Sequence, residues 1–485
     1  MRTFSYSRKS VPLFAVLSYI FLFVMPLSGC GGLNFETTTE KRVITGVPPE
    51  MQSDANSSHP AISADGRLVA FMSDATNLVV SRTNGAHNIY VKNTGTGVTT
   101  RVSTDSNGLA GNKDSDYPAI SADGRFVAFE SIASNLVPGD TNNTCTAASG
   151  TNINCPDVFL KDTQTGETKR ISTDAAGAQG DRESKHPAIS ADGRFVAFNS
   201  GASNIVPGDS NGMSDIFIKD TRTGAVTLAS SGTGGERGDD YSDDPAISAD
   251  GRFVAFMSDA SNLVADDTNG RTDIFLKDMQ TGALVRVSTD ASGGQGNDTS
   301  GFGSLAISVD GRYVAFDSGA ANLVPGDENG KRDIFLKDTQ TGAVSLVSTD
   351  AAGAQGTEDS YKSVTLSADV RLVSFSSDAP NLVPGDTNTT SGKTDIFVKD
   401  TQTGAITRVS TNTAGVQSNG KSDLASISAD GLFIAFVSEA GNLIPDDTNK
   451  KADIFLKDLK SGATTRISTS TAETMDEAET STVGP

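Results

Sequence analysis

Four residues whose side chains could bind a ligand or carry out acid–base chemistry occupy equivalent places in copies of one repeated segment. Each stands directly before an apolar, strand-like piece, and the four are His59, Tyr117, His186 and Asp244. Ser304, Ser363 and Leu424 fill the same place in the other copies. Such a set predicts a binding site ringing the mouth of a central channel. Imidazole and carboxylate groups there could also exchange protons. The alternative is a rim of separately solvated residues.

A second set of residues could bind a hard cation. Three loops carry Asp, Asn and Asp at positions i, i+2 and i+6, around a Gly. The sets are Asp209/Asn211/Asp215, Asp267/Asn269/Asp273 and Asp327/Asn329/Asp333. Oxygen ligands at this spacing suit calcium, the one cofactor that the sequence suggests. The alternative is an Asp/Asn-Gly turn that needs no ion.

Catalytic constellations are weak in this sequence. The 485 residues include only three His, and no Gly-x-Ser-x-Gly segment occurs, so neither general acid–base catalysis nor a nucleophilic serine is favoured. We therefore predict a non-enzymatic protein. A hydrolase or lyase that acts at the channel mouth through His59, His186 and Asp244 is the alternative.

The formal net charge of −21 argues against nucleic-acid binding, which needs clustered Lys and Arg to contact phosphates. It also argues against docking of the folded part on an anionic membrane. Only three Cys occur, too few for Cys-rich zinc modules or iron–sulfur clusters. Two of them, Cys145 and Cys155, stand close together and predict a disulfide if the protein is exported. Two free thiols are the alternative.

The elements that must position these residues come from internal repetition. A signature close to PAISADGRFVAF, followed by DIFLKDTQTGA, recurs seven times. Its turn position is Gly66, Gly124, Gly193, Gly251, Gly311, Val370 and Gly431, at intervals of 58, 69, 58, 60, 59 and 61 residues. The long interval reflects eleven extra residues in the loop that holds Cys145 and Cys155.

Each repeat contains four strand-like pieces rich in β-branched and aromatic residues and bounded by turn residues. The second piece, such as Phe195-Val-Ala-Phe198, is apolar on both faces, which requires sheets stacked face to face. Four strands in each of seven units predict an all-β fold, a seven-bladed β-propeller over residues 41–470. A solenoid would need polar caps, and both end repeats are as apolar as the middle ones.

The Ser-x-Asp-Gly-Arg-x-Val-Ala-Phe run with Asp-Ile-Phe-x-Lys-Asp resembles the WD-like repeat of TolB-type β-propellers. The resemblance covers nearly the whole chain after the N-terminal segment. It implies the propeller fold and says little about function. The repeats differ from that family in having Ala at positions 64, 122 and 191, where Pro is usual.

Residues 1–29 have a basic start and an apolar stretch, the pattern of an export signal. The segment ends in Leu27-Ser-Gly-Cys30, which resembles the bacterial lipobox. The resemblance implies that Cys30 is lipidated and becomes the mature N-terminus, followed by a linker over 30–40. Gly31 after it favours sorting to the outer membrane, facing the periplasm.

Two strand-like pieces compete to complete the ring, 41–45 near one end and Thr465–Ser468 near the other. We expect the C-terminal piece to keep its place, because it closes a short local hairpin. Residues 471–485 are acidic and without periodicity, so a disordered tail is expected. The two longer connections of each repeat must emerge on one face, and that acidic face is predicted to bind another envelope protein as a monomeric scaffold.

Overall fold

The computed structural model describes residues 50–80, 85–141, 145–146, 152–153, 155–387 and 393–471, with no side-chain description for Ser304. The predicted signal segment 1–29, the lipidated Cys30, the linker 30–40, the strand-like piece 41–45 and tail residues 472–485 lie outside the described residues. The described residues form strands and turns and contain no helix. No helix long and apolar enough to cross a membrane occurs among them.

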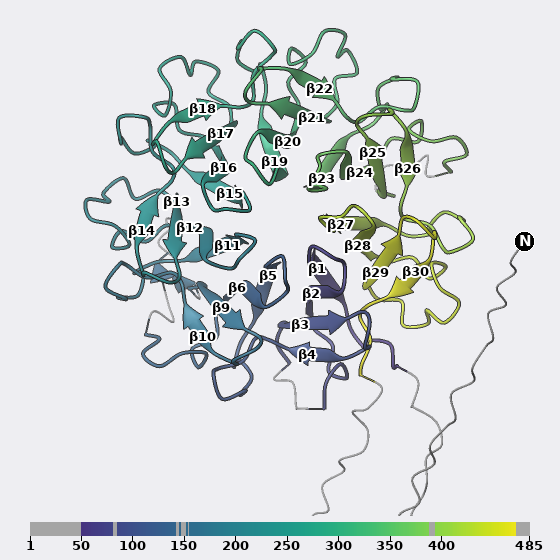
Figure 1. The fold of residues 1–485 in the computed structure, drawn as a ribbon, viewed down its shortest axis with the longest axis horizontal. Helices are drawn as coiled ribbons and strands as arrows, with labels where there is room; N and C mark the ends of the chain where they lie inside the picture. The colour runs from purple at the N-terminus through teal and green to yellow at the C-terminus, as the bar shows by residue number, and fades with distance from the viewer. Residues whose placement is uncertain are drawn as a thin grey trace, which may run out of the picture. The chain divides into compact units, whose positions relative to one another are not determined.

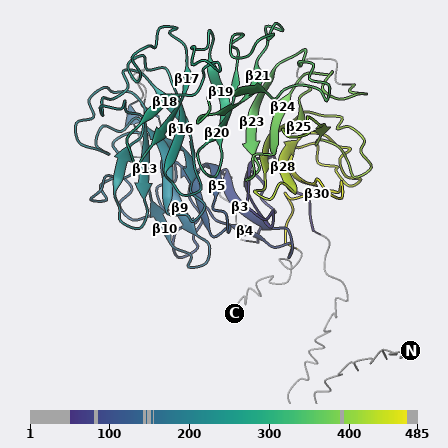
Figure 2. The same cartoon turned by 45° about the horizontal axis from the view of Figure 1, so that its top comes forward.

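Seven four-stranded antiparallel sheets surround a central opening, which confirms the predicted seven-bladed propeller (Figures 1 and 2). Each sheet comes from one repeat, and its first strand lies innermost in the ring. The first four blades are β1 (Ser57–Ile62), β2 (Leu68–Ser73), β3 (Asn88–Asn93) and β4 (Thr99–Arg101); β5 (Ser115–Ile120), β6 (Phe126–Ser131), β9 (Asp157–Asp162) and β10 (Thr168–Arg170); β11 (Ser184–Ile189), β12 (Phe195–Ser200), β13 (Asp215–Asp220) and β14 (Val226–Leu228); and β15 (Ser242–Ile247), β16 (Phe253–Ser258), β17 (Asp273–Asp278) and β18 (Leu284–Arg286). The last three are β19 (Ser300–Ile307), β20 (Tyr313–Ser318), β21 (Asp333–Asp338) and β22 (Val344–Leu346); β23 (Ser360–Leu366), β24 (Leu372–Ser377), β25 (Asp395–Asp400) and β26 (Ile406–Arg408); and β27 (Ser422–Ile427), β28 (Phe433–Ser438), β29 (Asp453–Asp458) and β30 (Thr464–Arg466).

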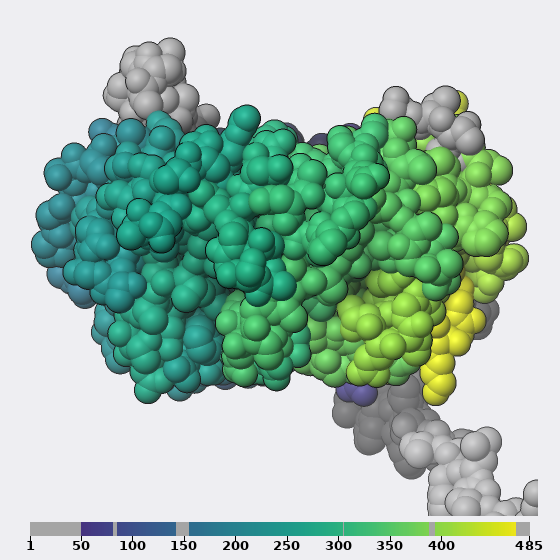
Figure 3. All heavy atoms as spheres, turned by 90° about the horizontal axis from the view of Figure 1, so that it is seen from above, coloured from purple at the N-terminus to yellow at the C-terminus, as the bar shows by residue number. Residues whose placement is uncertain are grey.

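The hydrophobic core lies between neighbouring blades. Ile216 and Ile218 of β13 pack with Val254 and Phe256 of β16 in the next blade, and all four are at most 5% exposed. The second strands are therefore apolar on both faces because each face contacts a different sheet. In a space-filling side view, successive blades adjoin one another from teal to yellow (Figure 3).

A buried lysine joins each blade to the one before it. Lys277 in β17 donates hydrogen bonds from Nζ to the carbonyl oxygens of Ser231 (2.8 Å) and Gly232 (3.2 Å) in the connection that leads into its blade. The equivalent lysines repeat the contact and are at most 6% exposed; they are Lys92, Lys161, Lys219, Lys337, Lys399 and Lys457. The Lys of the DIFLKD signature therefore has a structural role.

Among the described residues, the strands of the last blade all come from the seventh repeat. The seventh blade is β27-β28-β29-β30, so the C-terminal strand keeps its place as predicted. Gln52 forms an antiparallel bridge with Thr469, and Ser53 N donates to Ser468 O at 3.1 Å. In the other six blades the corresponding bridge joins the residues just after the fourth strand to the connection that leads into the next blade, as between Thr289 and Gln295. The segment Met51–Ser53 thus acts as the missing connection of the seventh blade.

The two faces of the ring differ in their connections. The turns between first and second strands and between third and fourth strands are short and repeat in every blade. The other connections are longer, and the one between β6 and β9 contains the small hairpin β7 (Cys145–Thr146) and β8 (Asn152–Ile153). Cys155 is disulfide-bonded. The side chain of Cys145 lies outside the described residues, so this pairing stays a prediction.

Candidate functional site at the channel mouth

The pairing register shifts within the first strand of each blade, and in six of the seven blades a residue other than Gly at this place has a positive φ and lines the channel. In β11, Lys185 pairs with Asn199 and Ala188 with Ala197, so two residues face one on β12. His186 within this bulge has φ of +48°. The same left-handed backbone occurs at His59, Tyr117, Asp244, Ser363 and Leu424. Residues other than Gly rarely adopt it, and a bulge re-aims the side chain at the edge of a sheet.

These bulge residues line one cavity of about 580 Å³. Its wall contains His59, Tyr117, His186, Asp244, Ser363 and Leu424, with Gly303 and Leu305 on either side of Ser304. Below them the wall is apolar and includes Ile62, Ile120, Ile189 and Ile247. The cavity opens beside the longer connections, because Ser58 pairs with Met72 near the end of β2 that leads into such a loop. The channel mouth is therefore polar at the rim and apolar deeper in.

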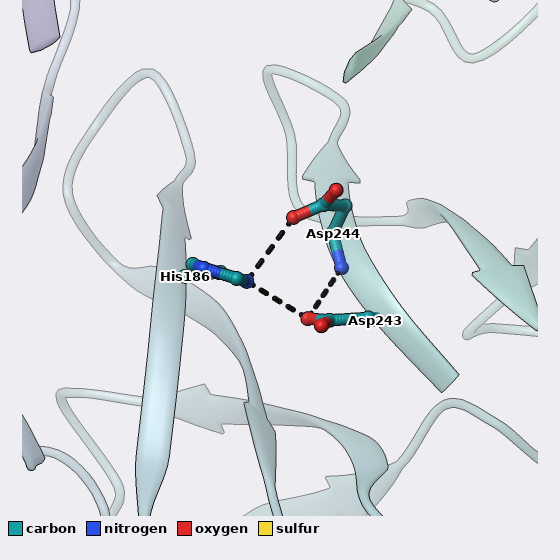
Figure 4. A group of neighbouring side chains, drawn as sticks. All are labelled: His186, Asp243 and Asp244. Carbon is teal, nitrogen blue, oxygen red and sulfur yellow. Dashed lines mark hydrogen bonds and ion pairs between the residues drawn. The ribbon is translucent and has the colours of Figure 1, made fainter. Parts of the chain in front are cut away.

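His186 and two aspartates of the next blade form a compact cluster (Figure 4). His186 Nδ1 lies 2.8 Å from Asp243 Oδ1 and 3.1 Å from Asp244 Oδ1. Asp244 N donates to Asp243 Oδ1 at 2.8 Å, and Asn199 Nδ2 donates to the same oxygen. The predicted pair His186 and Asp244 therefore does converge.

The charge state of this cluster follows from its hydrogen bonds. Burial lowers the pKa of His186, but hydrogen bonds to Asp243 and Asp244 outweigh it and raise the pKa to about 10. His186 is thus an imidazolium at neutral pH, held between two carboxylates. An imidazolium cannot accept a proton, so His186 does not act as a general base at neutral pH.

His59 does not join this cluster directly. Its ring packs against Tyr117 at a tilt of 40°, with centroids 4.3 Å apart, and Tyr117 in turn contacts the His186 ring edge-on at 4.8 Å. Burial lowers the pKa of His59, and its Nδ1 lies 2.9 Å from Ser58 Oγ. Three consecutive blades thus present a row of ring side chains that ends at the His186 cluster.

The charges differ between the two sides of the mouth. Around the fifth to seventh blades, Asp317 pairs with Arg332 at 2.8 Å and Asp423 with Lys421 at 3.1 Å. Around the first to fourth blades, the ionic partners of Asp116, Asp243 and Asp244 among the described residues are histidines. Burial raises the pKa of Glu130, whose Oε2 accepts a hydrogen bond from His186 N at 3.0 Å. The rings of His59, Tyr117 and His186 therefore lie on the side of the mouth where these carboxylates pair with histidines and not with Lys or Arg.

Comparison with known proteins gives the fold and no family. No family model matches the chain, and no curated protein matches it. A prolyl endopeptidase structure is similar, with a TM-score of 0.52, 12% identity and coverage of 86% of this chain and 50% of that chain. TolB from Acinetobacter baumannii gives 0.37, 16% identity and coverage of 64% and 59%. Oligogalacturonate lyase from Vibrio parahaemolyticus gives 0.48, 14% identity and coverage of 85% and 92%.

The chain has the propeller fold. TolB proteins are among the structures that resemble it, as the repeat signature predicts. The chain spans less than two thirds of the length of the TolB and prolyl endopeptidase structures named above. At these identities the likeness concerns the fold alone.

Sequence reasoning missed Asp243, which belongs to the cluster as fully as Asp244. The sequence carries a signal for it, because Asp243-Asp244-Pro245 has two acidic residues before the proline, where the third repeat has Lys185-His186-Pro187. Asn199 and Glu130 were also missed. They stand on second strands, and only the register of β12 with β11 brings Asn199 opposite the bulge.

In the loops predicted to bind calcium, hydrogen-bond donors of the protein itself contact the aspartate oxygens. In the fourth blade, Gln295 Nε2 donates to Asp267 (2.8 Å) and Asp273 (3.0 Å), and Arg286 lies 3.5 Å from Asp273. Asn269 Oδ1 accepts a hydrogen bond from Arg271 N at 2.8 Å and so closes a turn. These contacts favour the turn alternative, and calcium binding stays a prediction.

The third and fifth loops share this arrangement. In the third, Asn211 Nδ2 donates to Asp215 at 3.3 Å, and Arg237 lies 3.6 Å from Asp209. In the fifth, Asn329 Nδ2 donates to Asp333 at 2.7 Å and Gln355 Nε2 to Asp327 at 2.7 Å. The ionic contacts of the fifth loop differ, because Leu346 stands where the fourth blade has Arg286.

We expect Leu346→Arg to change how stability depends on pH. Burial raises the pKa of Asp333 to about 6, so the folded state binds more protons than the unfolded state between about pH 4 and 6 and loses stability as pH rises through that range. A guanidinium beside Asp333 removes this loss. The variant's free energy of unfolding relative to wild type should therefore rise by about 1–2 kcal/mol between pH 4 and 8, measured by urea unfolding.

Leu228→Arg is the matched control, because it occupies the same place in the third blade, where Arg237 already lies 3.7 Å from Asp215. The difference in unfolding free energy between Leu228→Arg and wild type should change less with pH than the difference for Leu346→Arg. An equal change in both variants would contradict the assignment of the effect to Asp327 and Asp333.

Proposed function

We propose that this protein is a non-enzymatic lipoprotein of the cell envelope, a scaffold that binds a segment of another envelope protein at the channel mouth. The anchor would be Cys30, placed in the outer membrane and facing the periplasm, as the lipobox resemblance implies. The fold is consistent with this role, and the sequence supplies the envelope assignment.

The observation that carries the proposal is the contrast between repeated and unrepeated residues. The Asp-Gly turns, the buried lysines and the loop aspartates recur and are explained by the contacts that they make within the ring. The bulge residues share one backbone conformation but differ in type, and they line the 580 Å³ cavity together. Variation confined to a concave site on a constant scaffold is typical of a binding surface.

The chemistry of the mouth favours a partner segment with a basic group. Tyr117 is 41% exposed and lies beside Asp116, Glu130 and the His186 cluster. Carboxylates around an aromatic ring attract an ammonium or a guanidinium group, by charge and by contact with the ring face. The apolar wall below would take an aliphatic side chain of the same segment.

A photo-crosslinking amino acid at Tyr117 tests the proposal in the intact envelope. We expect a discrete adduct that diminishes when Asp243 and Asp244 are both replaced by Ala and when salt is raised, because salt screens the attraction. Val285 is the control position, since it is 46% exposed on β18, away from the channel. Equal adducts from both positions, or none from Tyr117, would contradict the proposal.

A hydrolase or lyase is the second candidate, favoured by one observation. Asp243 and Asp244 hold His186 through Nδ1, which leaves Nε2 as the atom that could meet a substrate. With its pKa raised to about 10, His186 would serve as a proton donor or as a cationic contact, with a base supplied by another group. Turnover of a substrate that His186→Gln abolishes, with binding retained, would establish this function in place of the scaffold.

A further inference from the structure

The geometry of His186, Asp243 and Asp244 points to a binding site for one divalent first-row transition-metal ion, such as Mn²⁺ or Zn²⁺. Among the described residues, this is the one group of three or more His, Cys, Asp or Glu side chains whose ligand atoms converge, and these atoms lie within 4.8 Å of one another. One nitrogen and two carboxylate oxygens form a donor set that suits these ions.

The spacing of the donors is already close to that of a metal site. His186 Nδ1 lies 2.8 Å and 3.1 Å from the two carboxylate oxygens. Adjacent ligands of an ion with bonds of about 2.1 Å are about 3.0 Å apart in octahedral and about 3.4 Å apart in tetrahedral geometry. The ion would replace the proton on Nδ1, and the two carboxylates would move to bring one oxygen each into its coordination sphere.

The surrounding groups hold the ligands in place and leave room for further ones. Asn199 and the Asp244 backbone N–H orient Asp243, and Glu130 accepts a hydrogen bond from the His186 backbone N–H. Fixed ligands of this kind raise affinity. His186 and Asp244 line the channel cavity, while His186 and Asp243 line a second cavity of about 370 Å³. Water or a ligand can therefore reach the site from two sides.

A separate observation in the second cavity also favours a cation. Glu183 lines this cavity together with Glu130 and Asp243, and its Oε2 is buried without a hydrogen-bond partner within the part of the chain that the structure describes. A buried carboxylate oxygen without a donor is costly and gains from a nearby positive charge. Lys185 and His186 are the basic residues in that wall.

His87 provides an internal comparison with the same residue types in another arrangement. It contacts Asp74 through Nε2 at 3.2 Å and Asp116 through Nδ1 at 3.3 Å. Because the two nitrogens point in different directions, one ion cannot take the places of both protons. A histidine between two aspartates is therefore insufficient, and at His186 one nitrogen faces both carboxylates.

Titration calorimetry of the purified protein with MnCl₂ or ZnCl₂ tests the site, after treatment with a chelator. We expect one saturable site, at least tenfold weaker in His186→Gln and in Asp244→Asn, and unchanged within twofold in His87→Gln. Mg²⁺ and Ca²⁺ should compete weakly, because neither favours a nitrogen ligand. Circular dichroism of the chelated variants checks that they are folded, and Asp244→Asn keeps the shape of the side chain if His186→Gln is unstable.

Absence of saturable binding by wild type up to 1 mM of either ion, a concentration at about the weak limit for protein sites, would overturn the inference. Equal weakening in His87→Gln would overturn it as well. The inference rests on the proposed role of the mouth as a binding site, but the titration uses no partner protein. Metal binding without crosslinking at Tyr117 would support the metal site and contradict the scaffold, and crosslinking without saturable metal binding would support the scaffold and contradict the metal site.

Discussion

A chain that begins at residue 54 will be less stable than one that begins at residue 50, by about 4–6 kcal/mol of unfolding free energy. The four residues removed make the non-covalent closure of the ring. Gln52 Nε2 donates to Asp447 (2.7 Å) and Asp453 (3.2 Å), Ser53 Oγ donates to Asp453 (2.7 Å), and Met51 exchanges two hydrogen bonds with Ser470. At about 1 kcal/mol for each hydrogen bond, these five contacts give the expected loss.

The shorter chain should open first near the ring closure, before the whole ring unfolds. Hydrogen exchange in β30 and in β1 should rise in the shorter chain, while exchange in the third to fifth blades should stay as in the longer one. The chain that begins at residue 50 is the control, because it keeps every contact that the described residues make at the closure. Equal stability of the two chains would show that Met51–Ser53 does not hold the ring together.

The second large effect concerns the turn between first and second strands. Gly251→Ala should lower the unfolding free energy by about 2–4 kcal/mol, for two reasons. Gly251 has φ of +75°, which strains a residue with a Cβ. The added Cβ would also clash with the Phe195 ring in the preceding blade, so that the ring or the backbone at this contact between blades must shift.

Gly208→Ala separates these two causes. Gly208 has nearly the same φ, +79°, but nothing lies within 4 Å of a Cβ built there. We expect this variant to lose only about 1 kcal/mol in thermal or urea unfolding, the cost of the backbone alone. If both variants lost the same amount, the contact between Gly251 and Phe195 would have no part in joining the blades.

Most of the ring could be predicted from sequence because its determinants are local and recur. The turn glycines give the period, and Phe195-Val-Ala-Phe198 indicates a strand buried on both faces. One turn departs from the pattern, since Val370 adopts φ of +60° where the other repeats have Gly. The sequence shows the substitution at 370 but not that the backbone keeps its conformation there.

The candidate site could be predicted only in outline. The positions of His59, Tyr117, His186 and Asp244 follow from the repeat, and the structure brings them to one cavity. Their contacts depend on the bulge, which turns each side chain through a backbone angle that no residue type specifies. Asp243 joins the cluster for this reason, and His59 instead packs against Tyr117.

The loop aspartates show a second limit on predicting a site from sequence. Ligand spacing of the kind found in Asp267, Asn269 and Asp273 is shared by ion sites and by turns. What separates the two is the position of Gln295, which lies 22 residues beyond Asp273 and donates to it. Partners so far along the chain become visible only when the blades are assembled.

The bridge between Gln52 and Thr469 makes the order of the blades arbitrary. Each of the seven junctions has the same bridge and the same buried lysine, and one of them merely lacks a peptide link. A circular permutation that joins the present ends and opens another long connection would leave every packed surface unchanged. Such a ring has no structurally distinct first blade, and the blades differ around the channel in their bulge residues and in the charged side chains beside them.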